Sequence, residues 1–142
     1  MKTAITFFIC LASMVVSAQG IVGQWKTIDD ETGKPKSIVE IYKKGDAYFG
    51  KVVKLFREPS EDQDPVCKEC DDDRKNQKIL GMEIIRDLVQ DGKEFEDGTI
   101  LDPAKGSVYD CKLWVDEKNP DKLNVRGYLY FIYRTQHWVR VK

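Results

Sequence analysis

Apolar and polar side chains alternate along most of residues 21–142, and this pattern predicts β-strands rather than helices. β-branched and aromatic residues fill the alternating runs, and these residue types favour strands. The segment 79–90 has the best helical spacing, but it contains Gly81 and the adjacent pair Ile84 and Ile85. These residues favour a strand at least as much as a helix. We therefore predict eight strands, at 21–28, 37–44, 47–56, 79–90, 93–101, 107–117, 122–131 and 136–142.

The links between the predicted strands alternate in length. Tight turns are expected at 44–46, 91–92 and 118–121, where Gly or Asn-Pro signals a turn. The other links carry more functional side chains and lie at 29–36, 57–78, 102–106 and 133–135. Since alternate links of an up-and-down meander lie at the same end of the sheet, we expect these four to form one rim.

The expected fold class is all-β, a single antiparallel meander. Eight antiparallel strands of this length can close into a small up-and-down barrel, which leaves no exposed sheet edge. The interior of such a barrel holds either side chains or one small ligand. A β-sandwich of the same strands is the alternative, and we favour the barrel because the meander order needs no long crossover.

The first residues have the pattern of an export signal. Lys2 gives a basic start, residues 4–16 are mostly apolar, and small residues end the segment at Ala18. The apolar stretch is too short for a transmembrane helix, and no charge follows closely to support a membrane anchor. We predict a signal peptide at 1–18 and one domain at 19–142, without a membrane span, in the periplasm or outside the cell.

The charges of the chain exclude one class of partner. It has 23 Lys and Arg side chains against 24 Asp and Glu, a net charge of −1. The two signs are mixed along the chain, so there is no basic stripe for nucleic acid and no polybasic membrane patch. We expect no nucleic-acid partner and no cofactor.

Cys67 and Cys70 have a spacing found in disulfides, redox sites and zinc sites. The acidic residues around them should raise a thiol pKa, which argues against a redox-active pair. In an exported protein a structural disulfide is favoured. A zinc site would need Cys111 or His137, and both lie in alternating strands where a buried thiol and an ordinary strand histidine are the simpler interpretations.

Carboxylates are frequent in the longer links. The run 71–73 lacks the oxygen spacing and central Gly of a calcium loop, so a solvated charge run is favoured. Asp29, Asp30 and Asp102 have the chemistry for acid–base work at a sugar or ester. Asp also stabilises tight turns, and we favour that role.

Basic and aromatic residues supply a candidate binding site without metal or catalysis. A guanidinium binds carboxylate or phosphate and stacks on aromatic rings. Arg126 or Arg134 would supply the polar group of such a site, and aromatic side chains such as Trp114 would form its walls. An ion pair of Arg126 with Asp102 or Asp29 is the simpler alternative. The candidate binding residues are Asp29, Lys36, Asp102, Arg126, Tyr128, Arg134 and Trp138.

The Gly23-Gln24-Trp25 triplet opens the first strand and resembles the Gly-x-Trp signature of lipocalin-like barrels. That resemblance implies a Trp that plugs one end of the barrel and a basic residue of the last strand packed across it. Arg140 is the residue in the matching place. We therefore expect Gly23, Trp25 and Arg140 to pack together at a closed end.

Longer blocks along the chain resemble the exported bacterial family known as domain of unknown function 2147. The resemblance covers nearly all of 19–142 and implies an exported single-domain β protein with no assigned activity. The blocks that carry it are Trp25 to Asp30, Thr32 to Lys34, Lys36-Ser37, Tyr48 to Val52, Cys67 with Cys70, Ile79 to Met82, Gly98 to Pro103 with Gly106 and Tyr109, Leu123 with Val125 to Tyr128, and Arg134 to Gln136 with Trp138.

Three functions are consistent with these features. The leading hypothesis is non-catalytic binding of a small apolar or amphipathic molecule, or of an envelope component, through the long-loop rim. The second is a protein-interaction or envelope-structural module with a filled core and another envelope protein as partner. The third is a thiol- or carboxylate-based enzyme.

Overall fold

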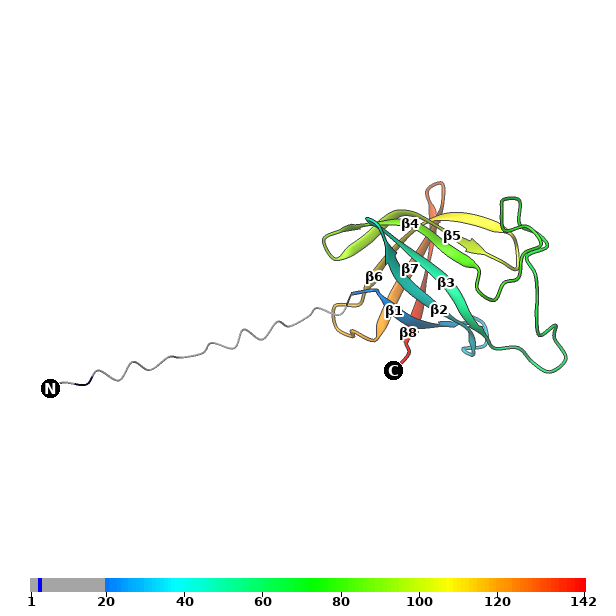
Figure 1. The fold of residues 1–142 in the computed structure, drawn as a ribbon, viewed down its shortest axis with the longest axis horizontal. Helices are drawn as coiled ribbons and strands as arrows, with labels where there is room; N and C mark the ends of the chain where they lie inside the picture. The colour runs from blue at the N-terminus through cyan, green and yellow to red at the C-terminus, as the bar shows by residue number, and fades with distance from the viewer. Residues whose placement is uncertain (1–2, 4–19) are drawn as a thin grey trace.

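The computed structural model describes residue 3 and residues 20–142, so the expected signal peptide at 1–18 lies outside the described residues except for residue 3 (Figure 1). No helix in the described part is long and apolar enough to cross a membrane. Eight strands make up the fold: β1 (Gly23–Ile28), β2 (Pro35–Lys44), β3 (Ala47–Leu55), β4 (Glu83–Asp91), β5 (Glu94–Asp102), β6 (Ser107–Val115), β7 (Lys122–Leu129) and β8 (Ile132–Arg140).

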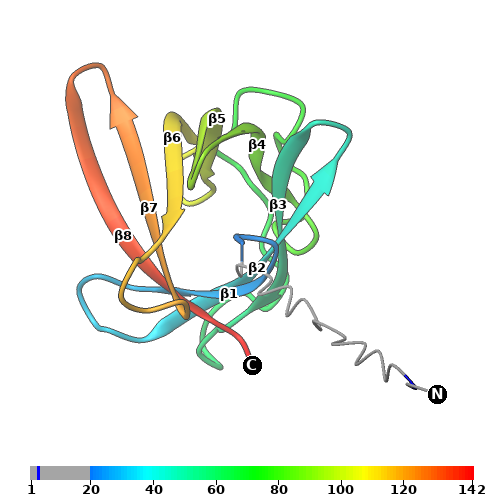
Figure 2. The ribbon, with the colours of Figure 1, turned by 90° about the vertical axis from the view of Figure 1, so that its left-hand side faces the viewer.

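The strands form a closed antiparallel barrel in which each pairs with its sequence neighbours. The barrel closes between β1 and β8, where Trp25 lies opposite Arg140 and Lys26 opposite Val139. Figure 2 shows the eight strands arranged around one ring. The predicted meander and eight-stranded barrel are confirmed, and the sandwich alternative is wrong, because a sandwich would leave β1 and β8 unpaired.

Two predicted strand starts differ from the structure by four residues, more than any other boundary. The strand predicted at 79–90 begins only at Glu83, because 79–82 belong to the preceding link and Gly81 has a positive φ of 88°. The last link is the two-residue turn Tyr130-Phe131 rather than 133–135, so β8 begins at Ile132. Tyr130 takes a φ of 56° there, a conformation normally signalled by Gly or Asn, and the turn was therefore invisible in the sequence.

The links between the strands lie alternately at the two ends of the barrel. The links 29–34, 56–82, 103–106 and 130–131 lie at one end of the barrel, which we call the open rim. The links 45–46, 92–93 and 116–121 lie at the opposite end, together with the start of β1 and the end of β8. The side chains that the sequence placed in the first three long links therefore gather at the open rim.

The end of the barrel opposite the open rim is filled by large side chains. Trp25 is fully buried, and its indole Nε1 donates to the Ile21 carbonyl at 2.8 Å. The Arg140 guanidinium lies 4.2 Å from the centre of the Trp25 ring and also donates to the carbonyls of Gly20 and Pro120. This end is consequently closed, and an interior ligand would enter from the open rim.

Candidate functional site

The interior of the barrel is accessible at the open rim. Directly opposed residues of antiparallel strands point to the same face. Gln136 shares a row with Val125 and Leu113, both buried, so Gln136 points inward, yet it is partly exposed. The same combination of an inward direction and partial exposure holds for Thr27, Ser37, Ile100 and Tyr109. The inward-facing side chains nearest the open rim are therefore in contact with solvent.

Trp138 lies at the floor of this accessible half. On β8 it stands between the inward-facing Arg140 of the closed end and Gln136, and it opposes the fully buried Leu123. Trp138 is 2% exposed, and its indole Nε1 is buried without a hydrogen-bond partner in the described structure. An unpaired buried donor costs about 1–3 kcal/mol, so this N–H calls for an acceptor.

A polar cluster spans the mouth above Trp138. Arg134 forms an ion pair with Asp30 of the β1–β2 link, and Gln136 Nε2 donates to the same carboxylate at 3.3 Å. Arg134 was expected in the last link but lies in β8, because the turn comes earlier. Its row with Gly127 and Cys111 directs it inward. Asp30 was considered as an acid–base residue or, preferably, as a turn residue, since its partner could not be known without the strand register.

Arg126 and Tyr128 lie on the outside of the barrel, away from Trp138. Arg126 shares an outward row with Lys112 and Thr135, and its Nε donates to Thr135 Oγ1 at 2.8 Å. Its guanidinium lies 4.9 Å from the Trp114 ring and 4.4 Å from the Tyr133 ring. The structure therefore does not bring Arg126 and Trp138 into one site, and Arg126 is not paired with Asp102 or Asp29.

Asp29 and Asp102 stabilise turns. Asp29 Oδ1 accepts hydrogen bonds from the backbone N–H groups of Glu31 and Thr32, at 2.8 and 2.9 Å. These bonds lower the pKa of Asp29 below its ordinary value. Asp102 Oδ1 accepts from the Ala104 N–H at 3.0 Å. This geometry favours the turn role over paired acid–base catalysis. The candidate binding residue Lys36 is exposed and lies in β2 rather than in the link.

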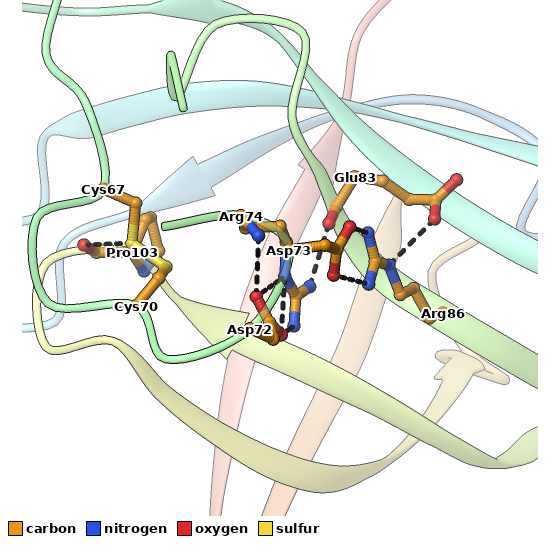
Figure 3. Close-up of polar contacts among 8 residues, drawn as sticks. All are labelled: Cys67, Cys70, Asp72, Asp73, Arg74, Glu83, Arg86 and Pro103. Atoms are coloured by element: carbon orange, nitrogen blue, oxygen red, sulfur yellow. Dashed lines mark hydrogen bonds and ion pairs between the residues drawn. A yellow bond between two sulfur atoms is a disulfide. The ribbon is translucent and has the colours of Figure 1, made fainter. Parts of the chain in front are cut away.

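Cys67 and Cys70 form the expected disulfide. Cys67 Sγ lies 3.4 Å from the Pro103 carbonyl, so the pair packs against the β5–β6 link (Figure 3). Cys111 is buried inside the barrel, where desolvation raises the pKa of its thiol to about 12. His137 points outward and bonds Asn124 at 2.8 Å. The alternative zinc site is therefore not assembled, because its four members lie in three different places.

The acidic run 71–73 is exposed to solvent, as predicted, and two of its carboxylates also anchor a loop to the barrel. It belongs to the disulfide loop, residues 66–78, which an antiparallel bridge between Val66 and Lys78 closes. Asp72 binds the buried Arg74 at 2.6 Å, and Arg74 in turn donates to the Glu83 carbonyl of β4 at 3.0 Å. Asp73 makes two 2.9 Å bonds to Arg86, also on β4 (Figure 3). These contacts fasten the loop to the barrel wall.

The Asp72–Arg74 pair predicts a dependence of stability on pH. Hydrogen bonds from Arg74 lower the pKa of Asp72 to about 2. A carboxyl group with a depressed folded pKa stabilises the fold above its unfolded pKa near 4, and this contribution disappears as the pH falls toward 2. Asp72→Asn should therefore be less stable than wild type at pH 7 in urea unfolding, and the gap should close between about pH 4 and pH 2. A gap that stays constant would contradict this role.

The disulfide loop also borders a depression at the open rim. Its volume is about 520 Å³, and its lining includes Glu69, Lys105, Tyr109 and Leu129. Tyr109 belongs to an inward-facing row, so this depression meets the mouth of the barrel. A second depression of about 410 Å³ lies between Glu96 and Tyr128. We regard the mouth, with the rim depression beside it, as the candidate binding site.

Comparisons with known proteins agree with this architecture. A solved structure, protein HP1028 from the human pathogen Helicobacter pylori, described as belonging to the lipocalin family, superposes with a TM-score of 0.70 at 14% identity. The match covers 85% of this chain and 82% of that protein, and at this identity it shows the fold alone. No curated protein matches the chain. Residues 23–140 match the family described as "uncharacterized protein conserved in bacteria (DUF2147)", and the chain belongs to this family.

Proposed function

We propose that this protein is a non-catalytic binding protein that holds a small apolar or amphipathic molecule in the open half of its barrel. The observation that carries the proposal is the unpartnered Nε1 of Trp138, a buried donor at the floor of the accessible half. Apolar walls with a few fixed polar groups are typical of small-molecule sites. A ligand acceptor at this N–H would remove the cost of the unpaired donor.

The mouth defines what such a ligand would need. The apolar part would lie against inward-facing residues such as Ile100 and Tyr109, which are partly exposed. An acceptor group, such as a carbonyl or a carboxylate, would bond Trp138. Arg134, Gln136 and Asp30 at the mouth would contact a second polar group or exclude water. The site would therefore have an N–H donor at its floor, apolar walls and a polar mouth. An amphipathic molecule with an acceptor group fits such a site better than a pure hydrocarbon.

We also propose that the protein acts outside the cytoplasm, in the periplasm or beyond the cell. Residues 1–18 have the pattern of an export signal. The Cys67–Cys70 disulfide supports this location, because disulfides persist in oxidising compartments.

Ligand extraction from protein purified without denaturation from its source tests the proposed function. Organic extraction and mass spectrometry should recover an amphipathic compound near one equivalent from wild type. Trp138→Phe keeps an aromatic ring but removes the indole N–H, and we expect about fivefold weaker retention, the equivalent of about 1 kcal/mol. Trp114→Phe on the outer wall is the matched control and should retain the compound. Extracts without any compound, or a cross-linked protein partner in its place, would favour the structural-module alternative instead.

A further inference from the structure

The tip of the β7–β8 hairpin exposes five consecutive apolar side chains at the open rim. Tyr130 and Phe131 are 92% and 90% exposed, and Leu129, Ile132 and Tyr133 are more than half exposed. In Figures 1 and 2 the turn between β7 and β8 projects beyond the neighbouring strands. Contiguous apolar surface of this kind marks an interaction site in soluble proteins.

Local folding does not explain the residues at the tip. The turn has two residues, and Tyr130 has a φ of 56°. Such turns favour Gly, Asn or Asp, because a positive φ is strained for a residue with a large side chain. The chain places Tyr and Phe there, where neither packs in the core. The aromatic character of the tip therefore has a role outside the fold.

The charges of the hairpin indicate the chemistry of the partner. No Asp or Glu follows Asp121, although the chain as a whole mixes both signs. Arg126 and Arg134 are the charged side chains nearest the tip in β7 and β8. At about 3.4 Å per residue they lie about 10–14 Å behind it. Arg134 is paired with Asp30, but its side chain is 67% exposed, and an exposed ion pair is weak enough for another anion to compete.

We propose that the β7–β8 hairpin docks the protein on the surface of a phospholipid bilayer that contains anionic lipid. Insertion by about 5–10 Å would place the tip at the boundary between headgroups and acyl chains. Arg126 and Arg134 would then face the lipid phosphates, and Tyr side chains favour this interfacial depth. The proposal goes beyond the binding function above and does not require a ligand inside the barrel.

A lipid surface fits the tip better than a protein does. A specific protein interface usually buries about 800 Å² and 20–30 residues on each side. The hairpin offers five apolar residues on a turn that projects beyond the neighbouring strands, and Asp30 of the β1–β2 link is paired with Arg134. A projection of this shape can enter a lipid interface without a preformed groove.

Vesicle flotation of residues 19–142 tests the proposal. The vesicles contain phosphatidylcholine alone or phosphatidylcholine mixed with anionic phosphatidylglycerol. Wild type should bind the mixed vesicles, and the double variant Tyr130→Asn with Phe131→Ser should bind at least about tenfold more weakly. The same variant should melt at an equal or higher temperature, because Asn suits the positive φ. A merely structural role of the tip would instead lower the melting temperature.

Matched variants separate the contribution of the apolar tip from that of the Arg side chains. Val89→Ser with Val139→Ser removes exposed apolar side chains far from the tip, toward the closed end, and should leave binding unchanged. Arg126→Gln or Arg134→Gln should weaken binding to the mixed vesicles by about fivefold each and reduce its dependence on salt. Absence of vesicle binding by wild type, or binding that the tip variant retains, would overturn the proposal. So would a tip-dependent self-association or protein cross-link in place of vesicle binding.

Discussion

Trp25→Ala is expected to lower the free energy of unfolding by about 3–5 kcal/mol, the usual cost of removing a buried Trp. Trp25 is fully buried, donates a 2.8 Å hydrogen bond to Ile21, and supports the Arg140 guanidinium on its ring. Truncation would leave a cavity at the closed end and loosen the start of β1 and the end of β8, which pair there. Urea unfolding followed by circular dichroism measures the loss.

Trp114→Ala is the matched control for this change. Trp114 is an outer-wall residue with Arg126 and Lys112 against its ring, and part of its surface is exposed. Its loss should cost no more than about 1–2 kcal/mol, from cation–π contacts and partial burial. Equal losses for both variants would show that Trp25 does not close the barrel as described.

Gly106→Ala is expected to cost about 3 kcal/mol and to loosen the disulfide loop. Gly106 has a φ of 70°, which costs a residue with a Cβ about 1–2 kcal/mol. A Cβ atom would also overlap the main-chain carbonyl of Glu69, and forcing atoms into a packed region costs about 1–3 kcal/mol. The loop must move away from the β5–β6 link to make room. Hydrogen exchange should rise in 66–78, beyond the fall in global stability seen by urea unfolding.

Gly92→Ala isolates the steric part of this effect. Gly92 has a similar φ of 62°, but no atom would lie within 4 Å of its Cβ. This variant should lose only about 1–2 kcal/mol and leave exchange in 66–78 unchanged. If the two glycine variants behave alike, the disulfide loop does not pack on Gly106.

The barrel and its open rim were predictable because they depend on signals that the chain carries locally. Period-two alternation located all eight strands, and their order allowed a closed meander. The candidate site was predicted less well, because it depends on which residues oppose each other. Arg126 opposes Thr135 on the outer face, while Trp138 opposes Leu123 on the inner face. A turn one residue longer would shift the register of β8 and move Trp138 to the outer face with Arg126.

Other features required the tertiary structure. Tyr130 makes a turn without Gly or Asn, so no typical turn residue marked its position. Asp72 is exposed as predicted, but its bond to Arg74 was not foreseen, because nothing in the chain shows that Arg74 becomes buried against β4. The run of apolar residues from Leu129 to Tyr133 did interrupt the alternation, and this interruption was the one available sign of the exposed tip.

The indole N–H signals of the three tryptophans test the central claim, that the open half of the barrel binds an amphipathic molecule at Trp138, most directly. In a ¹⁵N–¹H spectrum titrated with dodecanoate below its critical micelle concentration, the Trp138 signal, assigned by its loss in Trp138→Phe, should shift. The Trp25 signal is held by Ile21, and Trp114 lies outside, so neither should move. A shift of Trp114 with an unchanged Trp138 signal, or no shift at all, would contradict binding in the barrel.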